Sequence, residues 1–181
     1  MLTPLRGGSV YIVKNDKVIE LTEFPLPDSG APCPVILPKE TQLWLAYFIH
    51  HDDPRFEEKY SKIWSDSNEP CVESCFAVVS MLALAHTFGQ PGEHNFETHP
   101  LSKRGLQPFM VAEVKNSSWL AALTQAHLCD TSITSSAEQY RHIIFAFHDE
   151  TFECLAKDFK TFIRHGESPL AGIVSLAGDH F

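Results

Sequence analysis

Basic residues are scarce and scattered in this chain of 181 residues, which has 14 lysines and arginines against 23 aspartates and glutamates. The formal net charge is -9, and the nearest approach to a basic patch is the pair Lys103 and Arg104. Affinity for the phosphates of nucleic acids needs clustered cations, so we expect no nucleic-acid partner. The acidic residues are dispersed, which is typical of a solvated surface that keeps a protein soluble.

Long apolar runs and a cysteine framework are also missing. The most apolar stretch, residues 75–85, is too short to cross a bilayer, so we expect no membrane association. The first 13 residues hold no long apolar segment, and we expect no signal peptide. The five cysteines are an odd number, which argues against a secreted disulfide scaffold and predicts a cytoplasmic location. Cys71 and Cys75 have no second cysteine pair with which to complete a metal site.

The motifs of the common nucleotide-dependent enzymes are absent. The sequence has no phosphate-binding loop and no dinucleotide fingerprint, and Gly7-Gly8 is an isolated pair. No serine stands in a Gly-x-Ser-x-Gly elbow. A cysteine nucleophile at Cys154 with His148 as its base is disfavoured, because Cys154 lies among apolar residues and is better explained as a core thiol.

Apolar residues make up 44% of the chain, and its 13 phenylalanines predict a well-filled core. Strands are predicted where β-branched and aromatic residues gather, with residues 10–13 and 18–21 forming a hairpin. The other predicted strands are residues 41–50, 109–114, 140–147 and 151–155.

Helices are predicted where apolar residues recur at helical spacing or a cap precedes a suitable run. The predicted helices are residues 54–64, a helix capped near residues 116–118, and a short helix over residues 168–177. Residues 75–87 suit either a helix or a buried strand. The prolines of residues 24–38 predict an extended connection, and residues 88–108 a long loop. The pattern indicates one α+β domain over residues 1–181, with a mainly antiparallel sheet and two to four helices.

Several of the ten histidines stand near carboxylates, which raises the hypothesis of a metal site. His94 and His99 share the long loop with Glu93 and Glu97, and His148 precedes Asp149, with Glu153 nearby. If the fold brought His94, His99, His148 and Asp149 together, they would suit zinc, iron or manganese. The alternative, which the spacing favours, is that these histidines are surface or hydrogen-bonded groups.

Segments in the middle of the chain resemble those of a set of uncharacterised bacterial proteins of similar size. The segments are His99-Pro100-Leu101, Arg104-Gly105-Leu106, residues 113–119 and residues 147–154. The resemblance covers roughly residues 76–154 and implies a bacterial single domain. It implies no activity, substrate or cofactor, and it carries over no functional residue.

The leading hypothesis is a non-catalytic binding or interaction domain that works through residues 94–108 and the adjoining sheet, with no cofactor. Arg104 in this loop offers a planar fork for a carboxylate or phosphate. The candidate binding residues for a small molecule or protein partner are His99, Arg104, Trp119, His148 and Asp149. The rival hypotheses are a metal-dependent hydrolase that uses the His/Asp/Glu cluster and a structural homo-oligomer.

Overall fold

The chain folds around one antiparallel sheet of seven strands, in the order β1-β5-β6-β7-β4-β3-β2. The structure is a computed structural model, and it describes residues 15–30, 34–40, 42–56, 75–89, 91–126, 139–165 and 168–178. The strands are β1 (Lys17–Glu20), β2 (Val35–Lys39), β3 (Gln42–Phe48), β4 (Cys75–Gly89), β5 (Val111–Lys115), β6 (Arg141–Ala146) and β7 (Thr151–His165). The helices are the 3-10 helices η1 (Glu93–Thr98) and η2 (Ser102–Arg104) and the α-helices α1 (Ser118–Ala126) and α3 (Pro169–Gly178).

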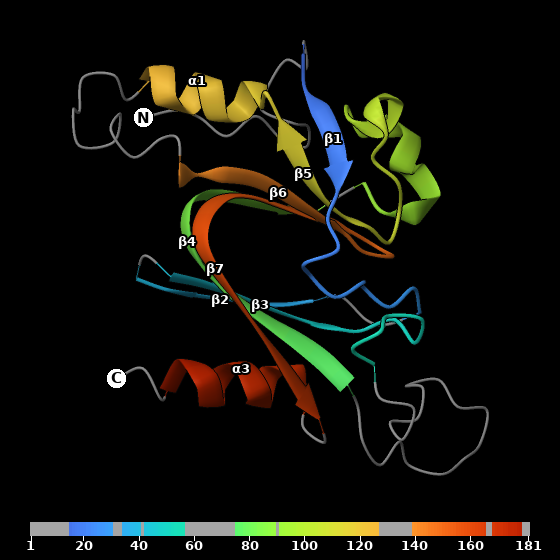
Figure 1. The fold of residues 1–181 in the computed structure, drawn as a ribbon, viewed down its shortest axis with the longest axis vertical. Coiled ribbons are helices and arrows are strands. Elements are labelled where there is room, and N and C mark those ends of the chain that lie inside the picture. Colours follow the sequence, from blue (N-terminus) through green and yellow to red (C-terminus); the bar gives the residue numbers. More distant parts are fainter. Residues whose placement is uncertain are drawn as a thin grey trace.

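The long strands β4 and β7 form the bend of the sheet. They pair from Cys75 opposite His165 to Gly89 opposite Thr151, and both arc from one half of the molecule to the other (Figure 1). The register shifts twice along this ladder, and Asp158 in the bulged part of β7 has a φ of 56°. A bulge adds a residue to one strand and increases its bend, so the irregularities lie where the sheet curves.

The bend gives the sheet a concave and a convex face, which hold separate cores. The concave face is filled with aromatic rings: Phe145 lies 5.4 Å from Phe24 and 5.7 Å from Tyr47 between ring centroids. On the convex face, α1 and the 3-10 helices cover the half with β5 and β6, and α3 covers the half with β2 and β3 (Figure 1).

Both of the α-helices in the described residues begin as the sequence predicts. Ser117 is the N-cap of α1, because its Oγ accepts a hydrogen bond of 3.1 Å from the Leu120 amide. Ser168 caps α3 through a 3.2 Å bond from the Ala171 amide, with Pro169 as the first helical residue. The antiparallel sheet with helices confirms the α+β prediction in its coarse form, although the sheet dominates the fold more than predicted.

The structure decides the predictions for three further segments, and two other predicted elements lie wholly or mostly outside the described residues. The ambiguous segment 75–87 is strand β4. The proline-rich segment 24–38 ends in a strand, β2, whose Pro38 is tolerated because β2 lies at an edge of the sheet. The loop at residues 88–108 contains η1 and η2. The first arm of the predicted hairpin and most of the predicted helix at 54–64 lie outside the described residues.

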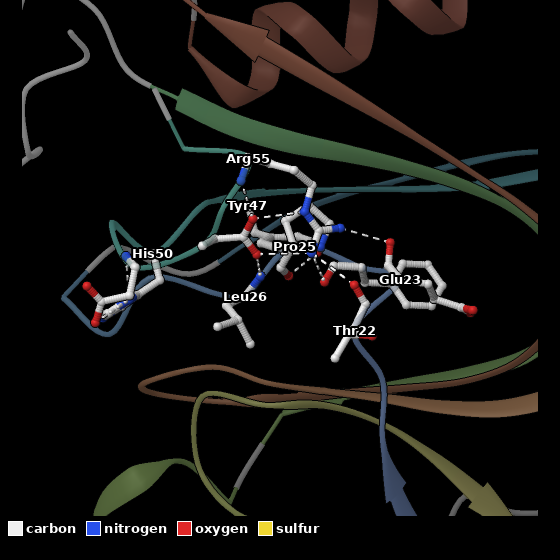
Figure 2. Close-up of polar contacts among 10 residues, drawn as sticks. Thr22, Glu23, Pro25, Leu26, Tyr47, His50 and Arg55 are labelled. Atoms are coloured by element: carbon white, nitrogen blue, oxygen red, sulfur yellow. Dashed lines mark hydrogen bonds and ion pairs between the residues drawn. The ribbon is translucent and has the colours of Figure 1, made fainter. Parts of the chain in front are cut away.

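A polar clamp joins the segment before β2 to the segment after β3. Asp53 accepts hydrogen bonds from the Leu26 amide at 2.8 Å and from Arg55 Nε at 2.8 Å. The guanidinium of Arg55 also donates to the carbonyls of Thr22, Glu23 and Phe24 (Figure 2). These contacts hold the chain that carries Phe24 into the concave core.

No helix among these described ranges is long and apolar enough to cross a membrane.

The concave core predicts that two phenylalanines differ greatly in how much they stabilise the fold. Phe145 is 0% exposed and Phe88 is 38% exposed. We expect Phe145→Ala to lower the free energy of unfolding by about 3–5 kcal/mol, through lost burial and a cavity. Phe88→Ala, the matched control, should change it by about 0.5 kcal/mol or less. Urea denaturation measures both, and equal losses would contradict the assignment of the core.

Candidate functional site

A buried glutamate joins two histidines on the convex face of the sheet. Glu153 of β7 is 5% exposed, and its Oε2 lies 3.0 Å from Nε2 of His142 on β6. Its Oε1 lies 3.2 Å from Nε2 of His99, which stands between η1 and η2. His142 pairs with Leu155 in the β6–β7 ladder, so Glu153 is its diagonal neighbour on the same face. The β6–β7 hairpin and the distant segment between η1 and η2 thus meet at one carboxylate.

The network continues to the start of α1. Ser117 Oγ lies 2.9 Å from Nδ1 of His142, and both side chains are buried. The Leu101 amide donates to Nδ1 of His99 at 3.1 Å, so this nitrogen carries no proton. One proton arrangement satisfies these four hydrogen bonds with both imidazoles neutral. Ser117 donates to His142, and each histidine donates its Nε2 proton to Glu153.

These hydrogen bonds keep Glu153 ionised. Burial alone would raise its pKa, but the hydrogen bonds from His142 and His99, together with electrostatic attraction to the same two side chains, outweigh burial and lower the pKa from 4.5 to about 2. Trp119 of α1 packs edge-on against His142, with ring centroids 5.2 Å apart. The network is therefore enclosed by α1 on one side and by the 3-10 helices on the other.

A pocket of about 790 Å³ opens beside this network. Its wall includes Ser117 and His142, and the rest comes from the end of β5, from α1 and from the approach to β6. The lining residues are Glu113, Val114, Lys115, Asn116, Ser117, Leu120, Ala121, Thr124, Gln125, Tyr140, Arg141 and His142. The pocket therefore combines apolar side chains with several hydrogen-bonding groups.

Two cations share one carboxylate at the pocket. Glu113 Oε1 lies 2.6 Å from Lys115 Nζ, and its Oε2 lies 3.0 Å from Arg141. Burial would raise the pKa of Glu113, but hydrogen bonds from Arg141 and Lys115 outweigh it and hold the pKa below its usual range. The charged residues of the described lining carry one net positive charge, and Glu23, outside that lining, also pairs with Arg141 at 2.6 Å.

The sequence-predicted residues fall into three places. His99 and Trp119 both belong to the Glu153 network, through Glu153 and His142 respectively. His148 and Asp149 form a separate turn, 2.8 Å apart, and Arg104 is exposed at the end of η2. The structure therefore does not bring the five candidate binding residues together.

The proposed metal ligands are divided in the same way. His94 lies beside His148, with ring centroids 5.8 Å apart, whereas His99 is buried against Glu153. His148 directs Nδ1 at Asp149 and Nε2 at Glu93, 3.2 Å away. Since the two ring nitrogens point in opposite directions, these two carboxylates do not converge with His148 on one ion.

Sequence reasoning missed the roles of Ser117 and His142, and it considered Glu153 only as a metal ligand. One signal was available. His142 is the single imidazole of residues 140–147, which are apolar from residue 143 onward, and Glu153 is the single carboxylate of residues 151–155. A polar side chain on the inner face of a core strand needs a partner there, and the hairpin places these two side by side.

Ser117, His142 and Glu153 have the contacts of a nucleophile, a base and an orienting carboxylate. The surroundings do not suit acyl transfer. The Leu120 amide already donates to Ser117, and the Ser118 amide donates to Asp16 Oδ2 at 3.1 Å. An oxyanion needs such amides unoccupied, and the carboxylate of Asp16 would repel it. The arrangement is better suited to holding the pocket wall than to attacking a substrate.

The carboxylate network predicts a specific acid sensitivity. The folded-state pKa of Glu153 lies below its unfolded value, so its ionisation stabilises the fold above about pH 5. This stabilisation, about 3 kcal/mol, is lost as the pH falls toward 2. Glu153→Gln should be less stable at pH 7, and its unfolding free energy should fall less steeply over this range.

Glu97→Gln is the matched control, because Glu97 is exposed. Urea denaturation at a series of pH values measures all three proteins. If Glu153→Gln kept the wild-type pH dependence, Glu153 would not be the titrating group.

Comparisons with protein-family models, with curated proteins and with solved structures found no match to this chain. The resemblance to uncharacterised bacterial proteins is not tested by these comparisons and stays a prediction.

Proposed function

We propose that the protein is a non-catalytic binding domain whose ligand is a small amphipathic organic anion held in the pocket between α1, β5 and β6. The observation that carries this proposal is the pocket of about 790 Å³ beside a fully hydrogen-bonded wall. Ligand sites are concave, mainly apolar and provided with a few fixed polar groups. The volume lies within the range of about 300–1,000 Å³ that such sites occupy.

The apolar part of the ligand is expected to lie against Val114, Leu120 and Ala121, which line the pocket. Burial of apolar surface contributes most of the affinity of such a ligand, at about 25 cal/mol per Å². Asn116, Thr124, Gln125 and Tyr140 add amide and hydroxyl groups to the lining. These groups would orient the polar end of the ligand.

The charge at the pocket supports an anionic ligand. Lys115 and Arg141 both pair with Glu113, the acidic residue of the described lining, and Arg141 also pairs with Glu23 at 2.6 Å. The Glu23 side chain is 51% exposed, so an anionic ligand would take its place beside Arg141. The rest of the acidic surface repels anions, so a local positive site directs them to this position. A carboxylate or sulfonate joined to an apolar body fits both features.

In this proposal, the segment at residues 94–108 supports the pocket and does not contact the ligand. His99 hydrogen-bonds to Glu153, which in turn holds His142 at the pocket wall. A wall whose side chains are already fixed loses less conformational freedom when a ligand binds. This assigns to His99 and Trp119 a positioning role, in place of the direct binding role that the sequence suggested.

The odd number of cysteines supports a reducing compartment, and we retain the bacterial cytoplasm as the proposed location.

Blocking the pocket should remove binding without unfolding the protein. Ala121 lines the pocket and is exposed on α1, whereas Ala171 is exposed on α3. The probe is anilinonaphthalene sulfonate, an aromatic anion whose fluorescence rises in an apolar site. We expect Ala121→Trp to weaken its binding at least tenfold, about 1.4 kcal/mol, because the indole would occupy the pocket.

Ala171→Trp, the matched control, should bind the probe as the wild type does. A medium-chain carboxylate should compete with the probe, since it shares the anionic head and apolar body. Equal binding by both variants would refute the pocket as the ligand site. Competition by a neutral alcohol of the same length, as strong as that of the carboxylate, would refute the preference for anions.

A further inference from the structure

Three potential metal ligands converge directly after β3. His50, His51 and Asp52 each offer one ligand atom, and these atoms all lie within 4.8 Å of one another. His51 Nε2 lies 3.3 Å from Asp52 Oδ1, and His50 Nδ1 lies 3.7 Å from Asp52 Oδ2. The two imidazole rings lie side by side, with centroids 4.3 Å apart. Two ring nitrogens and a carboxylate therefore face one small volume.

These spacings suit the first coordination shell of a transition-metal ion. A tetrahedral zinc ion with ligands at about 2.0–2.1 Å has ligand atoms about 3.3 Å apart. The 3.3 Å between His51 Nε2 and Asp52 Oδ1 matches this separation. The full set of three ligand atoms lies within 4.8 Å of one another, so side-chain rotations would bring the set to coordination distance. Imidazole and carboxylate groups are common ligands of zinc and of other first-row transition metals.

The nitrogen of His50 that faces Asp52 carries a lone pair. The Asp52 amide donates to this Nδ1 at 3.2 Å, so the nitrogen is an acceptor. The carboxylate oxygens of Asp52 are acceptors as well. A cation bound here would replace the Asp52 amide as the partner of this lone pair, and the exposed amide would then be hydrated.

The chain beneath this cluster is fixed. Asp53, the next residue, has a side chain that is 0% exposed and is held by Arg55 and by the Leu26 amide (Figure 2). The Asp53 amide also donates to the His50 carbonyl at 3.0 Å, which closes the turn. A ligand set on such a support needs little ordering before it binds an ion.

We propose that His50, His51 and Asp52 form a binding site for a divalent transition-metal ion such as Zn²⁺, with water completing its coordination. The side chains are 21%, 42% and 73% exposed in that order, so an ion can reach them and keep open positions toward solvent. The site shares no residue with the pocket lining and does not depend on the proposed function.

Titration calorimetry with Zn²⁺ on the untagged full chain tests this site. We expect one high-affinity equivalent for the wild type, and affinity at least about tenfold weaker for His51→Ala and for Asp52→Asn, because each loses a ligand. His86→Ala is the matched control, because it removes an exposed histidine elsewhere, on β4. His148→Ala removes the histidine of the other His/Asp pair, in the turn before β7. Both should bind Zn²⁺ as the wild type does.

Thermal melting of the metal-free variants should match that of the wild type, since the substituted side chains lie on the surface. The proposal is overturned if the wild type binds no Zn²⁺, or if His51→Ala and Asp52→Asn bind it unchanged. It is also overturned if His86→Ala or His148→Ala loses as much affinity. Equal competition by Ca²⁺ would contradict imidazole ligation, because Ca²⁺ prefers oxygen ligands.

Discussion

The buried carboxylate of Glu153 is the interaction on which the convex side of the molecule depends. Removing an ionised carboxylate from water costs several kcal/mol unless hydrogen bonds replace the lost hydration. His99 and His142 supply those bonds, and they come from parts of the chain that no local interaction would bring together. The network extends through His142 to Ser117, the cap of α1. One charge thereby fixes two strands, the 3-10 segment and a helix relative to one another.

The bend of the sheet gives this network its surroundings. Because β4 and β7 curve together, one continuous sheet has an aromatic core on its concave face and two helix-covered cores on its convex face. The Glu153 network lies within one convex layer, beneath α1. The pocket opens where α1 meets the ends of β5 and β6, and its wall is part of the same hydrogen-bonded set. Fold, network and pocket are thus linked by shared residues.

Local features of the fold were predictable from the sequence. The strands β3 and β6 are short, strongly apolar runs, and the caps predicted at residues 116–118 and at Ser168 precede the two α-helices of the described residues. The antiparallel arrangement follows from the irregular order of predicted elements. Segment 75–87 was ambiguous because an apolar run without polar alternation suits a buried strand and a helix equally. Its pairing with β7 along fifteen residues decided the matter.

The site was harder to predict because it depends on register. His142 and Glu153 face each other only because His142 pairs with Leu155, and sequence patterns do not give that pairing. The sequence predicts His99 as a candidate binding residue and also, with His94 and His148, as a candidate metal ligand, because all three histidines stand near carboxylates. In the fold, His99 is buried on the sheet, apart from the other two. Loop residues have no periodic pattern from which their partners can be inferred.

The most direct test of the Glu153 network is the proton position on each histidine, measured by long-range ¹⁵N–¹H correlation in labelled protein near neutral pH. The account predicts that His99 and His142 are both neutral and both carry the proton on Nε2, because each donates to Glu153. Glu153→Gln should change both signals, and Glu97→Gln should change neither. Averaged signals from rapidly exchanging tautomers at His99 and His142 in the wild type would contradict the network, and with it the fixed pocket wall.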